Sequence, residues 1–215
     1  MMQNKVDAIR QYAKEKLGGD RSGHDFYHVE RVAKLAKKIA LQEGCSNTEL
    51  IEAVSYLHDV LDDKVFRDVL AEKEHLKTFL KNLNFGSENT SELLYIIENL
   101  SFSKEIESGK ADLSLEGQIV QDADRIDALG AIGILRTAYY GGHNQSPLYD
   151  PNVSPRTLNS KKEYREEGTV INHFYEKLFR LPASMNTKAG KLEAEKRKAF
   201  MEYFLETFYS EWNLS

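Results

Sequence analysis

The sequence predicts an all-α protein. Glycine and proline are scarce, at 13 and 4 of 215 residues, whereas glutamate, lysine, leucine and alanine, which favour helices, are abundant. Apolar residues recur at helical spacing along most of the chain, and no stretch sustains the alternation that is typical of β-strands. Because this length suits one hydrophobic core, we expect residues 1–215 to form a single domain.

In the first half of the chain, apolar stripes and capping residues mark five helices. A helix begins well at a side chain that accepts a hydrogen bond from the backbone of its first turn. The predicted helices are residues 2–17, ended by Gly18; a helix capped by Asp25; a helix that opens at Ser46, with Glu49 completing a capping box; and residues 68–83 and 87–99, capped by Asp68 and Ser87. Residues 101–112 are polar and are expected to be irregular.

The second half of the chain predicts helices on either side of a proline-rich loop. Ser114 caps a helical pattern that runs to Tyr140, with a bend expected near Gly130 or Gly133. Residues 141–159 hold three of the four prolines and predict a long ordered loop or a mobile lid. C-terminal helices then fill residues 160–215: one at 168–180, and a long one capped by Thr187. A stripe along the latter predicts core packing or a dimer contact: Phe200, Phe204, Phe208 and Trp212.

Charge and composition restrict the class of protein. The net charge is -5 and the pI is about 5.8, so the basic face that nucleic-acid binding requires is not expected. Small phosphorylated ligands remain compatible with this charge. Cys45 is the single cysteine, which favours a reducing, cytoplasmic compartment. We expect no signal peptide and no membrane span, because no long apolar stretch is present.

Three apolar stripes are each interrupted by a histidine or an aspartate. His28 lies in line with Val32, Leu35 and Ile39; His58 lies in line with Val54 and Leu61, with Asp59 beside it; and Asp124 lies in line with Val120 and Ala131. Such stripes face the core, where an unpartnered carboxylate costs several kcal/mol. A cation shared by these imidazoles and carboxylates would satisfy them all. The alternative is that each is an ordinary buried polar residue with its own hydrogen bonds.

Three segments carry a resemblance to a known family. GHDFYHVERV, SYLHDVLDDK and VQDADRID resemble the signatures of the HD-domain metal-dependent phosphohydrolases, whose ligands follow the order H…HD…D. The resemblance covers a core of about residues 20–140 and implies an HD-domain helical bundle. It also implies that His28, His58, Asp59 and Asp124 bind the metal. The whole chain is most similar to small stand-alone bacterial members, some of which hydrolyse nucleoside triphosphates or other nucleotides.

The resemblance also suggests roles for residues near these ligands. In relatives with an acidic residue three positions after the His-Asp pair, it positions or deprotonates the attacking water, which would be Asp62 here; the alternative is a solvated carboxylate. Asp127 would orient a ligand from behind it or form a salt bridge. Their positions near the proposed ligands, rather than the resemblance, suggest roles for three further residues. Lys64 and Arg125 would bind phosphate oxygens, and His24 would contact phosphate or support a ligand from behind it. The alternative for each is an ordinary surface group. One divalent ion is expected, with Mn²⁺ favoured and Fe²⁺, Co²⁺, Ni²⁺, Zn²⁺ or Mg²⁺ compatible.

The predicted function is therefore hydrolysis of a small phosphorylated substrate, most naturally a nucleotide. Cleavage of nucleoside triphosphates with release of pyrophosphate is the leading hypothesis, followed by 5′-nucleotidase or phosphodiesterase activity. A metal-containing domain that senses nucleotides without turnover is one alternative. Another is a metal-free helical interaction protein. A homodimer is compatible with each of them.

Overall fold

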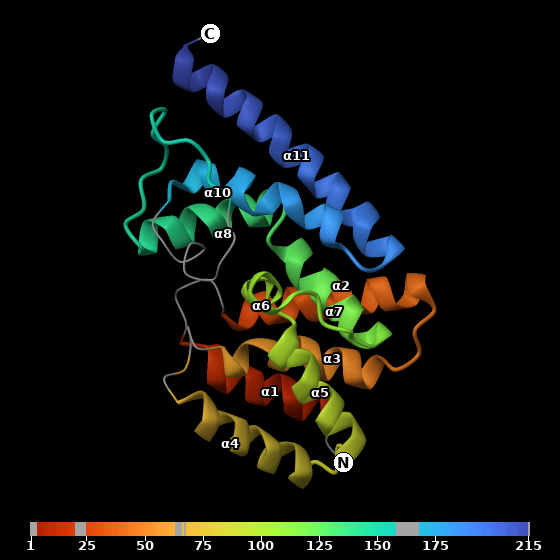
Figure 1. Ribbon diagram of the computed structural model, residues 1–215. Helices are drawn as coiled ribbons and strands as arrows, with labels where there is room; N and C mark the ends of the chain where they lie inside the picture. Colours follow the sequence, from red (N-terminus) through yellow and green to blue (C-terminus); the bar gives the residue numbers. More distant parts are fainter. Residues whose placement is uncertain (1–3, 20–24, 63–65, 67, 158–167, 215) are drawn as a thin grey trace.

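The computed structural model describes residues 4–19, 25–62, 66, 68–157 and 168–214, and these ranges contain helices and no strand. The all-α prediction is therefore confirmed (Figure 1). The main helices are α1 Lys5–Leu17, α2 Phe26–Glu43, α3 Thr48–Leu57, α4 Val69–Asn82, α5 Ser87–Asn99, α6 Phe102–Ser108, α7 Leu115–Asp127, α8 Gly130–His143, α10 Val170–Glu176 and α11 Lys188–Asn213; the 3₁₀ helices are η1 His58–Leu61 and η2 Leu178–Ser184.

The helices that carry the predicted ligands form the centre of the molecule. Helix α2 packs on both α3 and α7, and these two also pack on each other. Helices α1 and α5 contact α3, and α4 lies beyond them at one end (Figure 1). Helix α11 crosses the other end and contacts α7 and α8. Because Val32, Val54 and Val120 are each fully buried, the three stripes face a common core along α2, α3 and α7, as their periodicity predicts. The predicted extension of the third stripe to Ala131 is wrong, because this residue lies in α8 and is exposed.

Four predicted N-caps are confirmed by their hydrogen bonds. The Asp25 and Asp68 side chains accept from the backbone N–H groups of His28 and Ala71, each at 2.9 Å. Ser114 accepts from Gly117 at 3.3 Å. Thr187 accepts from Gly190 at 3.0 Å. These bonds satisfy N–H groups that a helix leaves without an internal partner, so they fix where α2, α4, α7 and α11 begin.

Two predicted caps are wrong by one residue. Helix α3 begins at Thr48 after Asn47, and Asn47 makes no capping bond with its side chain, so the Ser46 capping box does not form. Ser87 is the first residue of α5 rather than its cap. Gly86 precedes it with φ of 92°, a left-handed value that glycine adopts without strain.

The prediction that the polar segment 101–112 is irregular holds for residues 109–112 and is wrong for residues 102–108, which form α6. Ser101 accepts a hydrogen bond from the Lys104 backbone at 3.2 Å and begins the short helix α6. Tertiary contacts hold it in place: Glu105 pairs with Arg125, and the Lys177 ammonium lies 5.4 Å from the centre of the Phe102 ring. Tertiary contacts of this kind override a weak local propensity.

The predicted bend and the predicted loop also differ in detail from the structure. Helix α7 ends at Asp127, and Gly130 takes φ of 73° as α8 begins, so the bend is a break. Helix α8 then continues through Gly141 to His143. A Cβ at Gly141 would lie 2.3 Å from Val170 Cγ2, so this glycine permits close packing against α10 rather than a turn. The irregular segment begins at Asn144, and residues 158–159 lie outside the described ranges.

The aromatic stripe of α11 is partly core and partly surface. Phe204 and Phe208 pack against the core, whereas Phe200 and Trp212 are about half exposed. Tyr149, from the irregular segment, packs edge-on against Phe208 and Trp212, with ring centres 5.7 and 5.1 Å away. Among the described residues, none of the helices combines the length and the apolar character that crossing a bilayer demands.

Candidate metal centre

His28 is fixed in the first turn of α2 from two sides. Its backbone N–H donates to the Asp25 cap, and its side chain is 1% exposed. Nδ1 lies 2.7 Å from Asp127 Oδ2. Because an ionised carboxylate only accepts hydrogen bonds, Nδ1 carries the proton and Nε2 presents its lone pair to the centre of the molecule.

His58 and Asp59 lie where α3 tightens into a 3₁₀ turn. The sequence pattern treats His58 and Leu61 as a continuation of the helical stripe, but α3 ends at Leu57 and residues 58–61 form η1. His58 Nδ1 donates to the Ser55 carbonyl at 2.8 Å, which directs Nε2 toward the cluster and leaves it as the ligand atom when the ring is neutral. Both side chains are buried, at 3% and 8% exposure, and point toward α2 and α7.

Asp124 completes the cluster from α7. Its Oδ1 lies 3.3 Å from His28 Nε2 and 3.6 Å from His58 Nε2, and these two nitrogens are 3.3 Å apart. The three groups offer ligand atoms that all lie within 4.8 Å of one another. Asp59 faces both imidazoles as well, with Oδ2 3.5 Å from His28 Nε2 and Oδ1 3.5 Å from His58 Nε2.

The chemistry of these donors fits a divalent cation. The two Nε2 atoms and an Asp124 oxygen converge, with Asp59 beside both imidazoles, and acceptors this close repel one another unless a cation or a proton lies among them. Bonds of about 2.0–2.3 Å to a shared ion place neighbouring ligand atoms about 3–3.7 Å apart. The separations of 3.3–3.6 Å among the two Nε2 atoms and Asp124 Oδ1 fall in this range. Imidazole and carboxylate together suit a first-row transition metal better than Mg²⁺ alone.

The same groups shift one another's pKa values. Burial by itself would lower the pKa of His58, but the charges of Asp59 and Asp124 and the bond to Asp124 raise it to about 10. Burial would raise the pKa of Asp124, yet its bonds to His28 and His58 hold that pKa well below its usual range. Without a metal, His58 is therefore protonated at neutral pH, and an incoming cation must displace that proton.

Two arginines hold Asp127 behind His28. Arg31 donates to both carboxylate oxygens at 2.9 and 3.0 Å, and Arg136 donates to Oδ2 at 2.9 Å. Although burial opposes it, these bonds and the one to His28 hold the pKa of Asp127 far below its usual value. The sequence pattern missed both arginines. Arg31 is detectable because it lies one turn after His28 on α2, whereas Arg136 is brought in by the break between α7 and α8.

Comparisons with known proteins identify the family of this chain. The HD domain matches residues 25–129. The protein YpgQ of Bacillus subtilis is 34% identical over 200 residues, which cover 93% of this chain and 90% of YpgQ. This chain belongs to the HD-domain family. Its recognition from the ordered H…HD…D segments is thereby confirmed.

Solved structures place this HD-domain protein among close structural relatives. A crystal structure from Lactobacillus plantarum is 42% identical over the full length of both chains, with a TM-score of 0.88. An HD-superfamily hydrolase from Bacillus thuringiensis is 40% identical over 98% of each chain, with a TM-score of 0.77. The crystal structure of YpgQ in complex with ADP aligns over 96% of this chain and 97% of YpgQ, at 29% identity and a TM-score of 0.76.

The structure describes two of the four other residues to which the sequence assigned a role in catalysis or phosphate binding, namely Asp62 and Arg125. Asp62 ends η1; its backbone N–H donates to the Asp59 carbonyl at 3.1 Å, so the two residues are held together. Arg125 is 3% exposed and donates to Glu105 and, at 3.0 Å, to Ser184 Oγ. This placement favours a structural role over the expected phosphate contact. His24 and Lys64 lie outside the described residues.

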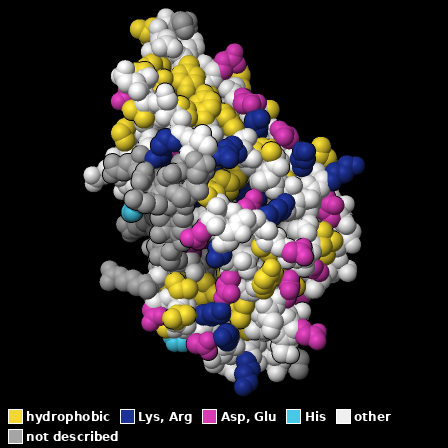
Figure 2. Space-filling model, viewed as in Figure 1, with side chains coloured by type: hydrophobic (Ala, Val, Ile, Leu, Met, Phe, Trp, Pro, Cys, Tyr) yellow, Lys and Arg dark blue, Asp and Glu magenta, His cyan; other side chains and the backbone are white. Residues whose placement is uncertain are grey.

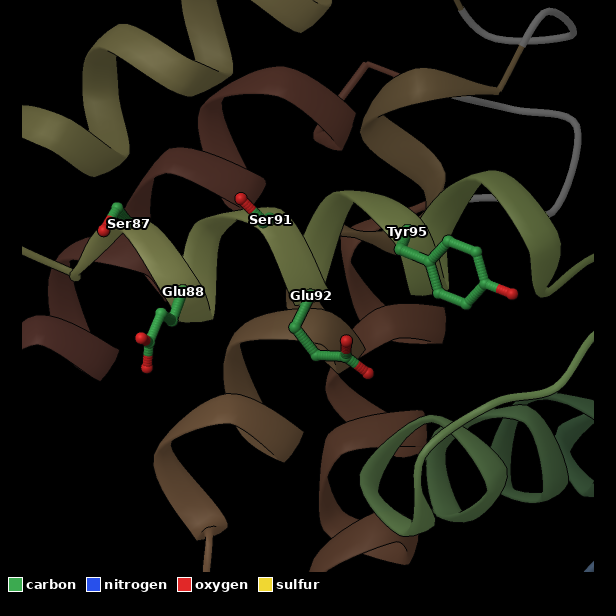
Figure 3. Close-up of a pocket in the computed structure, with 5 residues that line it drawn as sticks. All are labelled: Ser87, Glu88, Ser91, Glu92 and Tyr95. Atoms are coloured by element: carbon green, nitrogen blue, oxygen red, sulfur yellow. The ribbon is translucent and has the colours of Figure 1, made fainter.

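A shallow hollow elsewhere on the HD domain lacks the features of the metal centre. Its lining side chains all come from α5 (Figure 3): Ser87, Glu88, Ser91, Glu92 and Tyr95. It includes no imidazole and none of the clustered ligands. The two carboxylates are on the open surface of one helix, where water solvates them, so the hollow does not compete with the buried cluster as a reaction site.

Proposed function

We propose that this HD-domain protein is a metal-dependent phosphohydrolase that acts on nucleotides, with His28, His58, Asp59 and Asp124 as the ligands of one divalent ion. The observation that supports the proposal is the cluster of His28 Nε2, His58 Nε2 and Asp124 Oδ1 at separations of 3.3–3.6 Å, with an Asp59 oxygen 3.5 Å from each imidazole. The ADP bound to YpgQ supports a nucleotide as the ligand class, because ADP carries the phosphate groups that such a centre recognises.

A divalent ion held by these side chains would polarise a phosphoryl oxygen and make a coordinated water acidic near neutral pH. The protein's own contribution is orientation. The Ser55 carbonyl holds Nδ1 of His58, and Asp127 holds Nδ1 of His28. The Asp124 side chain is 27% exposed, so we infer that substrate approaches the centre from this side. We assign Asp62 as the group that positions the attacking water and accepts its proton.

Mn²⁺ is the favoured ion, and cleavage of a nucleoside triphosphate to release pyrophosphate is the favoured reaction. The net charge of -5 supports a small phosphorylated ligand over a nucleic acid. The single cysteine supports a cytoplasmic location. We retain His24 and Lys64 as proposed phosphate contacts because His24 lies four residues before His28 and Lys64 lies five residues after Asp59 in the sequence.

The test is a panel of ribo- and deoxynucleoside mono-, di- and triphosphates and a cyclic nucleotide, each with Mn²⁺, Co²⁺ or Mg²⁺ and with products identified. We expect pyrophosphate from triphosphates. Orthophosphate from monophosphates would instead support a 5′-nucleotidase, and a ring-opened monophosphate would support a phosphodiesterase. Tight nucleotide binding with no turnover under any metal would contradict the enzymatic proposal and favour a sensing module.

The variant Asp62→Ala separates catalysis from metal binding. It should keep the metal content of the wild type and lose turnover by roughly 100-fold or more, as expected when a general base is removed. Asp62→Glu is the matched control, because it keeps a carboxylate and should retain measurable activity. Full activity of Asp62→Ala with metal bound would remove Asp62 from the mechanism.

A further inference from the structure

Helix α8 exposes large apolar and aromatic side chains to water. Leu135 is 68% exposed, and Tyr139 and Tyr140 are 54% and 46% exposed. Figure 2 shows hydrophobic side chains on the upper part of the molecule, the end that holds α8, α10 and α11 in Figure 1. Among the described residues, neither tyrosine side chain has a hydrogen bond, an ion pair or a ring contact. Both rings are therefore accessible to a ligand.

The same side of α8 reaches the metal centre through Arg136. Arg136 Nη1 lies 2.9 Å from Asp127 Oδ2, and that oxygen lies 2.7 Å from His28 Nδ1. Tyr139 and Tyr140 follow Arg136 by three and four residues, so their side chains leave α8 on the same side, one turn of about 5.4 Å further along. The two rings thus lie one helical turn from the side chain that joins α8 to the centre.

The charge of α8 suits an anionic ligand. The 14 residues of this helix include one arginine and one histidine but no aspartate or glutamate, although the whole chain has 34 acidic residues. The exposed Tyr95 on α5 differs, because it lines its hollow together with Glu88 and Glu92 (Figure 3), and carboxylates repel a phosphate group. Of these two surfaces, α8 is therefore the one that a phosphorylated ligand approaches without repulsion.

We propose that Tyr139 and Tyr140 form the platform on which the base of the substrate nucleotide stacks. This inference rests on the proposed nucleotide hydrolysis, which places the phosphate groups at the metal and leaves the base to be held on a neighbouring surface. An aromatic ring stacks on the flat face of any base, and the tyrosine hydroxyl stays hydrated while it does so. Because a purine offers the larger face, the platform binds purine nucleotides more tightly than pyrimidine nucleotides.

The test measures binding to the full chain by isothermal titration in the presence of Mn²⁺, with ADP, CDP and base-free pyrophosphate as probes. In the wild type, we expect ADP to bind more tightly than CDP. The double variant Tyr139→Ala with Tyr140→Ala should weaken ADP binding by roughly tenfold or more, because the stacking faces are removed. Its affinity for pyrophosphate should stay within about twofold of the wild type, and its preference for ADP over CDP should disappear.

Turnover of nucleoside triphosphates gives a second readout. The double alanine variant should raise KM with kcat unchanged, since stacking holds the substrate and the transition state equally. A variant that merely disturbed the fold around the metal would lower kcat as well.

Two controls separate base stacking from other effects of the substitutions. Tyr139→Phe with Tyr140→Phe keeps both rings and should bind ADP as the wild type does. Tyr203→Ala removes a ring that is 67% exposed on α11, and it should also leave ADP binding unchanged. Unchanged ADP affinity in the double alanine variant would overturn the proposal, and so would an equal loss of affinity for ADP and pyrophosphate.

The platform and the proposed hydrolysis can fail separately. If the wild type binds ADP through the two tyrosines but hydrolyses no nucleotide, the platform stands and the enzymatic proposal is wrong. If the wild type hydrolyses nucleotides with an ADP affinity that does not depend on either tyrosine, the enzymatic proposal stands and the platform is wrong.

Discussion

Helix α7 carries two aspartates only two residues apart that have opposite surroundings. Asp122 is fully buried and accepts hydrogen bonds from uncharged donors at the start of α11: the backbone N–H of Asn186 at 2.8 Å, the backbone N–H of Thr187 at 2.8 Å and the Thr187 hydroxyl at 2.8 Å. A Cβ at Gly190 would lie 2.4 Å from Asp122 Oδ2, so α11 approaches this carboxylate as closely as a glycine allows.

Asp124 points to the other side of α7 and meets two imidazoles instead. Its Oδ1 faces the Nε2 atoms of His28 and His58, and both Nδ1 atoms are already committed to other acceptors. Asp122 is the more buried of the two, yet its bonds are complete within the protein. The comparison shows that burial alone does not identify a functional carboxylate. The nature and the orientation of its partners do.

Replacing Asp124 should have the largest effect on function. We expect Asp124→Ala to lose the bound metal and to reduce nucleotide hydrolysis by roughly 1000-fold or more, because a ligand and its charge are removed together. Metal analysis of the purified variant and a turnover assay measure both. The fold should persist, since this side chain is partly exposed. A variant that keeps one equivalent of metal would exclude Asp124 as a ligand.

Replacing Asp122 should have the opposite signature. Asp122→Asn puts amide hydrogens where Asn186 and Thr187 already donate, so we expect the free energy of unfolding to fall by about 2–4 kcal/mol. Urea denaturation of the metal-free protein measures the loss. Metal stoichiometry at low temperature should match that of the wild type. If this variant lost metal without losing stability, the structural role given to Asp122 would be wrong.

Replacing Asp127 tests whether the carboxylate that holds His28 Nδ1 contributes to metal affinity. Asp127→Asn keeps the shape but removes the charge that fixes the His28 Nδ1 proton, so metal affinity should fall by about 10- to 100-fold. Isothermal titration with Mn²⁺ measures the change. Glu105→Gln is a control with a similar charge change, because it alters a buried ion pair with Arg125 away from the imidazoles. Equal affinities in both variants would contradict the orienting role.

The pH dependence of metal binding should be a smaller but distinctive effect. The pKa of His58 in the metal-free protein is raised to about 10, so below that pH the cation displaces a proton, and affinity should increase as pH rises toward 10. Calorimetry at pH 7.5 in buffers of different ionisation enthalpy should show release of about one proton. Protonated His58 also stabilises the metal-free fold. This contribution is fully present at pH values below the pKa of His58 in the unfolded chain, and it is lost as pH rises through about 10. A binding enthalpy that is independent of the buffer would refute the assignment.

Periodicity and local capping predicted the central helices, whereas the set of metal ligands came from the resemblance to the HD-domain family. Asp25 caps α2 and orients His28 by a bond within one turn, which a short motif can encode. The 3₁₀ turn at His58 and Asp59 was not predictable in this way, because a stripe of apolar residues does not distinguish an α-helix from its tightened last turn.

Features that depend on tertiary contacts were missed. Helix α6 is held by Arg125 and Lys177 from distant segments, and Arg136 reaches Asp127 only after the break at Gly130. Arg125 adjoins Asp124 in the sequence, which suggested a phosphate contact, but neighbouring residues on a helix point about 100° apart. Its side chain is directed instead to Glu105 and Ser184.

The most direct test of the shared cation is the anomalous scattering of a crystal grown with Mn²⁺. We predict one strong anomalous peak per chain, within bonding distance of His28 Nε2, His58 Nε2 and carboxylate oxygens of Asp59 and Asp124. A peak bound to other residues, or no peak at a saturating concentration of Mn²⁺, would contradict the account.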